Sequence, residues 1–444
     1  MKKNHGLHIF KFLMAIFLIL PCAFVFSACG KQGEKGDQGI QGIQGEKGDK
    51  GDNGKDAEQV SIYELYLSAK ASGEFDGTYL EFIETYIGVI YDNNAVVANK
   101  AAASTVCIDA YNGVKPARPS TGSGVIFSLD DDGNAFIVTN YHVTYYSNSL
   151  SHNAYKNYDI YLYGEISNNV IHASYVGGSQ TYDIAVLYVS NSEILKNSNA
   201  QSVSLSTGKT ILGSSVIASG NANGYGLAIT KGIISKDTEP VYMTIAGTRS
   251  LYRVLRHDAY ITNGSSGGGL FDMKGNLVGI TNGGDSSNSL INYAIPADIV
   301  FAVTTNIIKN CGYSDSNFSP KLCNLGITYE SFDVSTKYDD KNGIISVTSK
   351  ISISNLGSVT NENLKTLAVG DELVSITITT ASGKVYTKNA SDFAYTKDLP
   401  IQNIIQEFML LADASSTVKI TVQRNGETIS ASALVSDSDL MGLV

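Results

Sequence analysis

The stretch TNGSSGGGL, residues 262–270, places two adjacent serines, Ser265 and Ser266, inside a run of glycines. Glycine-rich stretches mark places where the backbone turns, so a serine hydroxyl is brought to a bend here. A serine hydroxyl is a weak nucleophile at neutral pH and reacts only beside a base, which itself needs an orienting carboxylate. The stretch therefore predicts a nucleophile if the chain also offers a histidine and an aspartate at structured positions.

The chain offers both residues in short runs that are typical of strands. His142 lies at the end of IVTNYHV, and Asp183 lies at the start of DIAVLYV. Further short β runs, separated by Gly, Asn and Asp turns, predict a sandwich or barrel. The order histidine, aspartate, serine suits a two-barrel β protease, and we predict that His142, Asp183 and Ser266 form a catalytic triad. The alternative is an ordinary strand-end histidine and an ordinary turn serine.

Five stretches resemble, in order, the successive motifs of HtrA/Deg-type trypsin-like serine proteases: TGSGVIF, IVTNYHV, DIAVLYV, GLAITKGIIS and HDAYITNGSSGGGL. The resemblance covers roughly residues 95–310 and implies a mostly β, chymotrypsin-like domain of two β-barrels. In the family's G-x-S-G-G pattern the third residue is the nucleophile, and only Ser266 fits that place. The N–H groups of Gly264 and Ser266 are then expected to form the oxyanion hole. Gly269 departs from the family's usual proline, without touching the triad.

The same resemblance implies where the substrate residue before the scissile bond binds. Its pocket is expected between the residues preceding the nucleophile and the stretch GITNGG, 279–284. The expected substrate-binding residues are Tyr260, Thr281, Asn282 and Gly283. Tyr260 is expected at or near the pocket base, and no acid takes its place there. Cleavage after Arg or Lys is therefore disfavoured, and small or medium apolar residues are expected at this position.

The C-terminal block, residues 322–436, resembles a PDZ domain, a β-sandwich with helices. NLGI matches that family's carboxylate-binding loop, and LAVGDELVSI matches the stretch that carries GD before a strand. The resemblance implies that the N–H groups of Leu325, Gly326 and Ile327 hold the C-terminal carboxylate of a peptide that adds a strand to the sheet. A helix is predicted from Pro400 onwards, and an Asn425-Gly426 turn between two strands. The alternative is a β-sandwich packing module. In either case, a linker at 311–321 is predicted to separate this block from the protease block.

Residues 1–28 read as a signal peptide, because lysines precede an apolar run that ends in small residues. The run closes with FSAC, which resembles the lipobox of bacterial lipoproteins although Phe26 replaces the usual Leu. We predict lipidation of Cys29, which would place the protein at the cell membrane, on its extracytoplasmic face. A plain secretory signal or an uncleaved anchor are the alternatives.

Every third residue from Gly30 to Gly54 is glycine, which is the signature of the collagen triple helix. Residues 29–57 therefore predict either a trimeric stalk or a flexible spacer. Residues 58–94 follow with two short helical patterns, the second opened by the capping box Thr78–Glu81. The protease resemblance also implies a homotrimer, which a trimeric stalk would suit.

The formal net charge of −10, without a Lys/Arg block, argues against a nucleic-acid partner. No His, Cys and Asp cluster has metal-ligand spacing, so neither a metal site nor a cofactor is expected. Cys311 and Cys323 can form a bridge or remain free thiols, and Cys107 is expected to be buried. The sequence thus predicts a serine endopeptidase acting on unfolded or misfolded exported proteins. A chaperone-like peptide binder with little or no proteolysis is the main alternative, and an adhesin built on the stalk is another.

Overall fold

The computed structural model describes residues 62–82, 85, 94–146, 153–164, 169–206, 210–245, 247–285, 287–310, 319–339 and 344–443. The predicted signal peptide, Cys29, the Gly-X-Y stalk and Cys311 lie outside these residues and stay predictions. The chain divides into two units, Met1–Asp76 and Gly77–Val444, which are described separately. Among the described residues, no helix combines the length and the apolar character needed to cross a bilayer.

Among the described residues, three helices precede the first barrel. In the first unit, α2 (Ile62–Ala71) confirms the first predicted helical pattern. In the second unit, α3 (Tyr79–Phe82) begins with the predicted capping box. The Thr78 N–H donates to Glu81 Oε2 over 2.6 Å, and the Glu81 N–H donates to Thr78 Oγ1 over 3.3 Å. These two bonds satisfy N–H groups that the first helical turn cannot pair. Helix α4 (Asn94–Ser104) then leads directly into the first strand.

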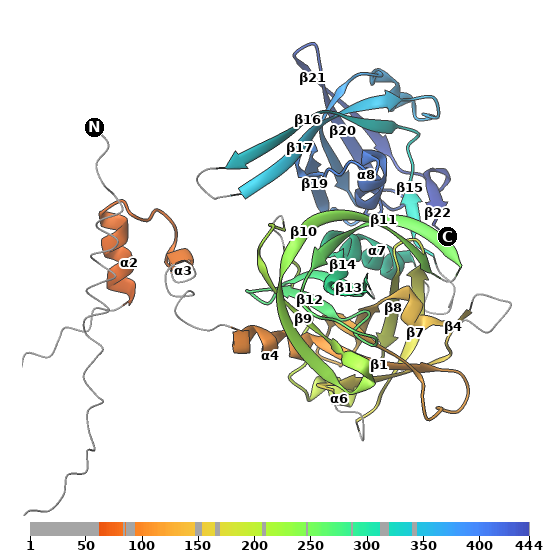
Figure 1. The fold of residues 1–444 in the computed structure, drawn as a ribbon. Helices are drawn as coiled ribbons and strands as arrows, with labels where there is room; N and C mark the ends of the chain where they lie inside the picture. The colour runs from red at the N-terminus through yellow and green to blue at the C-terminus, as the bar shows by residue number, and fades with distance from the viewer. Residues whose placement is uncertain are drawn as a thin grey trace, which may run out of the picture. The chain divides into compact units, whose positions relative to one another are not determined.

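The first barrel is a closed sheet with the strand order β1-β2-β3-β8-β7-β6 (Figure 1). Its strands are β1 (Thr105–Tyr111), β2 (Ser120–Leu129), β3 (Ala135–Thr139), β6 (Asn157–Leu162), β7 (Ile171–Ser179) and β8 (Ile184–Val189). The shorter elements α5 (Tyr141–Thr144), β4 (Tyr145–Tyr146), β5 (Asn153–Ala154) and α6 (Glu193–Lys196) lie in its loops. Fully buried Ile108, Ile126, Ile137, Ile160 and Leu187 belong to its core. Burying these side chains is the main force that closes the sheet.

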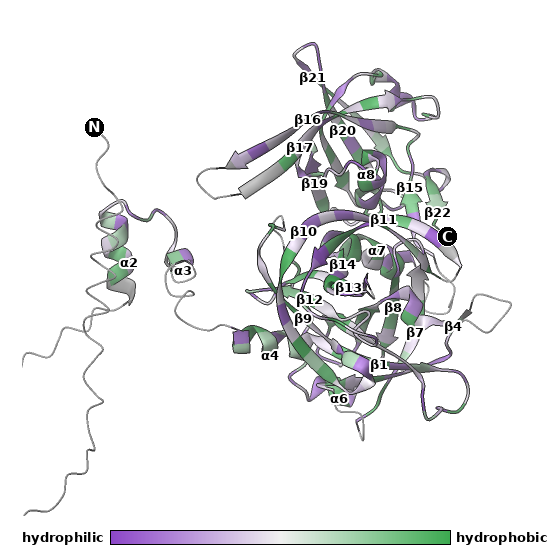
Figure 2. Ribbon diagram, in the orientation of Figure 1, coloured by the Kyte–Doolittle hydropathy of each residue, from purple (hydrophilic) through white to green (hydrophobic). Residues whose placement is uncertain are grey.

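The second barrel is also closed, in the order β10-β11-β14-β13-β12-β9. Its strands are β9 (Ser215–Asn221), β10 (Leu227–Ile245), β11 (Thr248–His257), β12 (Gly269–Asp272), β13 (Leu277–Asp285) and β14 (Asn288–Pro296). The short helix η2 (Ala222–Gly224) joins β9 to β10. Partly buried and exposed residues alternate along the first part of the long strand β10, from Ala228 to Ile233, as expected of a strand with one exposed face. Figure 2 shows both hydrophobic and hydrophilic segments along this strand. The two closed barrels confirm the mostly β, trypsin-like fold.

The C-terminal domain follows α7 (Ala297–Asn310). Its main sheet has the order β16-β17-β18-β20-β21, with β19 paired to β18 and a separate pair β15-β22. The strands are β15 (Lys321–Cys323), β16 (Thr328–Asp339), β17 (Ile344–Asn355), β18 (Glu372–Thr379), β19 (Val385–Asn389), β20 (Thr417–Arg424), β21 (Glu427–Leu434) and β22 (Leu440–Gly442). The helices are η3 (Glu362–Thr366), η4 (Ala390–Asp392), α8 (Ile401–Met409) and η5 (Asp437–Asp439).

Two local predictions for this domain are confirmed. Helix α8 begins directly after Pro400 and buries its apolar residues, and Asn425-Gly426 joins β20 to β21 with positive φ at both positions.

Cys107 and Cys323 are both buried free thiols. Burial raises the pKa of the Cys107 thiol to about 12, so this thiol stays protonated at neutral pH.

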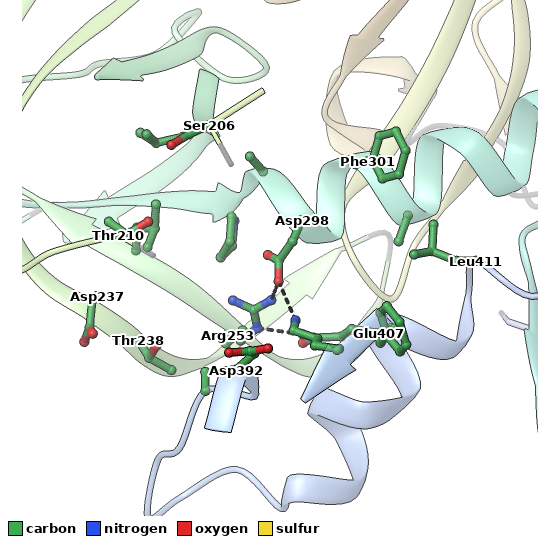
Figure 3. Close-up of a pocket in the computed structure, with 18 of the residues that line it drawn as sticks. Ser206, Thr210, Asp237, Thr238, Arg253, Asp298, Phe301, Asp392, Glu407 and Leu411 are labelled. Atoms are coloured by element: carbon green, nitrogen blue, oxygen red, sulfur yellow. Dashed lines mark hydrogen bonds and ion pairs between the residues drawn. The ribbon is translucent and has the colours of Figure 1, made fainter. Parts of the chain in front are cut away.

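A buried ion pair joins the C-terminal domain to the second barrel (Figure 3). Arg253 on β11 donates from Nε to Glu407 Oε2 on α8 over 2.6 Å. Its Nη2 donates to Asp298 Oδ2, at the start of α7, over 2.5 Å. Lys388 on β19 reaches the same Asp298 oxygen at 3.2 Å. The network borders a cavity of about 690 Å³ between the two domains, and its hydrogen bonds connect α8 to the barrel wall.

Candidate active site

The predicted nucleophile lies in the turn between β11 and β12, where the backbone conformation requires glycine. Gly264 has φ +88°, and a Cβ atom there would lie 2.3 Å from the Asn221 carbonyl oxygen. Gly267 has φ +84°, and its Cβ would lie 2.2 Å from the Ser123 carbonyl oxygen. Any side chain at either position would both strain the backbone and clash. The glycines flanking Ser266 are therefore structural requirements of this turn.

Hydrogen bonds fix the peptide planes on either side of Gly264 and Ser266. The Asn263 carbonyl accepts from Asn223 N–H over 2.6 Å. The Ser265 carbonyl accepts from the Thr281 hydroxyl over 2.7 Å and from the N–H of Gly268 over 2.9 Å. In a trans peptide the N–H points in the opposite direction to the carbonyl of the same plane. The carbonyls of residues 263 and 265 point toward their hydrogen-bond donors, so the N–H groups of residues 264 and 266 point away from those donors.

These two N–H groups are the pair expected to form the oxyanion hole. Within the described part of the chain, neither the Gly264 N–H nor the Ser266 N–H has a protein acceptor. Their neighbours in the turn do: Ser265 donates to the Thr262 carbonyl, and Gly267 donates to the Thr281 carbonyl. Two adjacent donors left without a protein acceptor are available to a ligand oxygen.

The predicted base and its carboxylate lie in direct contact. His142 is in α5, immediately after β3, and its Nδ1 lies 2.9 Å and 3.1 Å from the two Asp183 carboxylate oxygens. The His142 backbone N–H donates to Asp183 Oδ1 over 3.0 Å, and Asn140 Nδ2 donates to the Asp183 carbonyl over 2.9 Å. Because Nδ1 faces the carboxylate, it carries the proton in the neutral ring, which leaves Nε2 as an acceptor.

Asp183 is fully buried and has φ +54°, a conformation that residues other than glycine rarely adopt. Burial disfavours the charged imidazole of His142, but the Asp183 charge and hydrogen bond outweigh it and raise the pKa of His142 above its usual range. His257, the histidine nearest to Ser266 in sequence, behaves differently. It is buried inside the barrel, and burial lowers its pKa to about 4.

The nucleophile turn packs against the segment that carries His142. The Ser123 N–H donates to the Ser266 carbonyl over 2.8 Å, and a Cβ at Gly267 would lie 3.1 Å from the Asn140 N. Within the described residues, no hydrogen bond joins the Ser266 hydroxyl to the His142 ring. Such bonds are often long until substrate binds. The three side chains of the predicted triad thus belong to segments that meet where the two barrels face each other.

The expected pocket wall needs correction. Thr281 and Asn282 are only 1% and 2% exposed. The Thr281 hydroxyl braces the turn through the Ser265 carbonyl, and Asn282 Nδ2 donates to the Tyr252 hydroxyl over 2.7 Å. Both side chains are used inside the protein and do not line an open groove. Tyr260 is 53% exposed, so it lies at the surface and not at a pocket base.

The loop expected to bind a peptide carboxylate is also partly occupied by its own residues. Leu325 and Ile327 are buried, and Gly326 has φ +76°. The Gly326 N–H donates to Asn324 Oδ1 over 3.0 Å, so it is not free, contrary to expectation. Only a small cavity of about 20 Å³ separates this loop from α8, where Gln402 Oε1 accepts from the Tyr329 N–H over 3.0 Å. A peptide strand would have to displace these two side chains.

Some residues of the site were missed in the sequence. Ser123 and Asn223 both bond to the nucleophile turn, yet only the stretch TGSGVIF hinted at the first, and no local signal marks the second. Among the described residues, no group of three or more His, Cys, Asp and Glu side chains is arranged to hold a metal ion.

The chain is similar to several known proteins. Residues 122–280 match the family model described as a trypsin-like peptidase domain. The chain is 32% identical over 194 residues to the serine protease Do-like HtrA of Bacillus subtilis, covering 43% of this chain and 39% of that protein. It is 28% identical over 329 residues to the protein of the same description in Lactococcus lactis subsp. cremoris, covering 72% and 71%. A solved structure of the HtrA-type protease AlgW with tripeptide matches with 22% identity and a TM-score of 0.44, over 78% of this chain and 97% of that one.

The first of these relatives is thus matched over well under two thirds of its length. The chain contains a trypsin-like serine protease domain related to those of HtrA-type proteases.

Proposed function

We propose that this protein is an extracytoplasmic serine endopeptidase of HtrA type that hydrolyses peptide bonds with Ser266, His142 and Asp183. One observation carries the proposal. The paired His142–Asp183 side chains belong to segments that pack against a turn in which, among the described residues, the N–H groups of Gly264 and Ser266 have no protein acceptor. This arrangement offers a base, a nucleophile and an oxyanion site at one place.

The reaction follows from these positions. The Ser266 Oγ attacks the substrate carbonyl while His142 Nε2 takes its proton, and the negative charge of the tetrahedral oxygen is held by the two N–H groups. Asp183 stabilises the imidazolium. The imidazolium then gives its proton to the leaving amine, the C–N bond breaks, and an acyl ester remains on Ser266. Water, deprotonated by His142, attacks the ester and releases the new carboxylate, which restores the hydroxyl.

The finer parts of the proposal depend on the sequence. The signal peptide and the FSAC stretch support anchoring through a lipid on Cys29, with the domains on the extracytoplasmic face. The Gly-X-Y run supports a homotrimer, and the resemblance to HtrA proteases supports unfolded or misfolded exported proteins as substrates. The C-terminal domain would recruit them as a PDZ domain, with the N–H groups of Leu325 and Ile327 receiving a terminal carboxylate once Gln402 moves aside.

Denatured casein tests the proposal, with product termini read by mass spectrometry. The wild-type protein should cleave it, and Ser266→Ala should abolish cleavage. Ser265→Ala is the matched control, because that hydroxyl only accepts a 3.3 Å bond from the Thr262 N–H. It should retain cleavage. If Ser266→Ala cleaves as well as wild type, the assignment is wrong. If wild type binds casein without cutting it, the chaperone-like alternative holds instead.

A further inference from the structure

Ser123 lies on β2 of the first barrel, yet its hydrogen bonds reach the nucleophile turn of the second barrel. The residue is fully buried. Its hydroxyl donates to the Gly264 carbonyl over 2.7 Å and accepts from the Asn221 N–H, also over 2.7 Å. The hydroxyl is therefore both donor and acceptor, and both of its partners are backbone groups of the second barrel.

The backbone of Ser123 extends the same connection. Its N–H donates to the Ser266 carbonyl over 2.8 Å, and its carbonyl accepts from the Thr139 hydroxyl over 2.6 Å. Thr139 ends β3, three positions before the predicted base. One residue thus bonds the carbonyls of Gly264 and Ser266 on one side and the His142-bearing segment on the other.

The close approach of three segments explains why a small hydroxyl residue is needed here. A Cβ at Gly220 would lie 3.0 Å from the Ser123 Oγ and 3.1 Å from the Ser265 Cα. The hydroxyl fills the narrow space left by that glycine, between β2, β9 and the nucleophile turn. An alanine at 123 would remove the hydroxyl and leave the buried Asn221 N–H without its acceptor and the Gly264 carbonyl without its donor.

The Gly264 carbonyl matters because it belongs to the peptide plane between the two expected oxyanion donors. Asn223 holds the plane before it and Thr281 holds the plane after it, through the carbonyls of residues 263 and 265. The Ser123 hydroxyl holds the plane in the middle. The N–H of this middle plane, which belongs to Ser265, donates to the Thr262 carbonyl over 2.9 Å, so without the Ser123 bond the plane is held at one end only. Its tilt then changes more easily, and a change of tilt alters the angle between the N–H groups of Gly264 and Ser266.

We infer that Ser123 is a positioning residue that keeps the oxyanion hole in its productive geometry. The inference rests on the proposed function. It assigns a role to the serine of TGSGVIF, which touches neither the triad side chains nor, in the proposed reaction, the reacting atoms. Because the hole stabilises the transition state more than the bound substrate, its distortion lowers kcat and leaves KM nearly unchanged.

The test compares wild type, Ser123→Ala, Ser123→Cys and Ser219→Ala on a peptide substrate taken from the casein digest. Ser123→Ala should lower kcat by about tenfold to a hundredfold, less than or similar to the loss of one oxyanion donor, with KM within about twofold. A cysteine side chain is similar in size to serine but forms only weak hydrogen bonds, so the kcat of Ser123→Cys should fall between those of wild type and Ser123→Ala. Ser219 is a buried serine on β9 whose hydroxyl has no partner among the described residues, and its alanine variant should match wild type.

Inhibitor affinities separate positioning from general damage. A peptide boronic acid forms a tetrahedral adduct whose oxygen enters the hole, whereas the corresponding product peptide does not need it. Ser123→Ala should weaken boronate binding by about the same factor as kcat and leave product binding unchanged. The inference is overturned if a folded Ser123→Ala keeps wild-type kcat, or if it loses boronate and product binding equally.

If Ser123→Ala does not fold, Ser123→Cys decides, and wild-type kcat in that variant overturns the inference. A failure of the proposed function itself gives a different result, because wild type would then cleave no substrate.

Discussion

Glu407 allows a strict test of how the two domains are held together. The carboxylate is 4% exposed and bonds Arg253, which itself is also bonded to Asp298. Burial raises the pKa of Glu407 from 4.5 to about 7, although Arg253 opposes the rise. The substitution Glu407→Gln removes the titrating charge, keeps an oxygen that can accept from Arg253, and leaves Arg253 paired with Asp298.

The magnitude follows from the shift in pKa. A rise from 4.5 to about 7, at about 1.4 kcal/mol for each pKa unit, corresponds to about 3 kcal/mol. Because the pKa of the folded state lies above that of the unfolded state, this contribution to stability is fully present below pH 4.5. It is lost as the pH rises through about 7. A glutamine cannot ionise, so Glu407→Gln should nearly match wild type at about pH 4 and exceed its stability by up to about 3 kcal/mol at about pH 8.

Urea unfolding followed by far-UV circular dichroism measures the free energy of unfolding of both proteins at each pH. Exposed Glu427 on β21 supplies the control, because Glu427→Gln should change stability little and equally at both pH values. The reasoning is refuted if Glu407→Gln is less stable than wild type at about pH 8, or if the difference between them does not depend on pH. Either result would mean that the charge of Glu407 stabilises the contact with the barrel.

Three further predictions concern the active site and the first barrel. Gly264→Ala should lower kcat by about a hundredfold or more, because the added Cβ meets the Asn221 carbonyl and displaces the oxyanion donors. Gly247→Ala is the control and should keep kcat, because Gly247 has a similar φ but no atom lies within 4 Å of an added Cβ. The kcat/KM of wild type should rise with pH through an apparent pKa above 6.5, because His142 must be neutral to act as base and Asp183 raises its pKa. Asp183→Asn should shift the midpoint of that rise to lower pH, and pH–rate profiles of the two proteins measure the shift. Lys115→Met should lower the free energy of unfolding by about 2 kcal/mol, because Lys115 bridges two buried aspartates that face each other across β1 and β6, and urea titration should detect the loss.

The identity of the site residues could be predicted from the sequence, because catalysis needs particular residue types. A reactive serine requires a base and a carboxylate, and the glycines around Ser266 are needed wherever that turn forms. The structure brings His142 and Asp183 within 2.9 Å. Local elements were also predictable: the Thr78 capping box and the Asn425-Gly426 turn depend on interactions between residues only a few positions apart.

Only the tertiary structure decided which side chains face the site and which face the core. Asn282 and Thr281 belong to the stretch expected to line a pocket, but both side chains bond within the protein, Thr281 to the Ser265 carbonyl and Asn282 to the Tyr252 hydroxyl. The role of Ser123 depends on a bond to a residue 141 positions away, and the Arg253–Glu407 pair spans 154 positions. Contacts at such separations exist only when two closed barrels and a further domain pack together. Local propensity acts over only a few residues, so sequence patterns do not predict these long-range contacts.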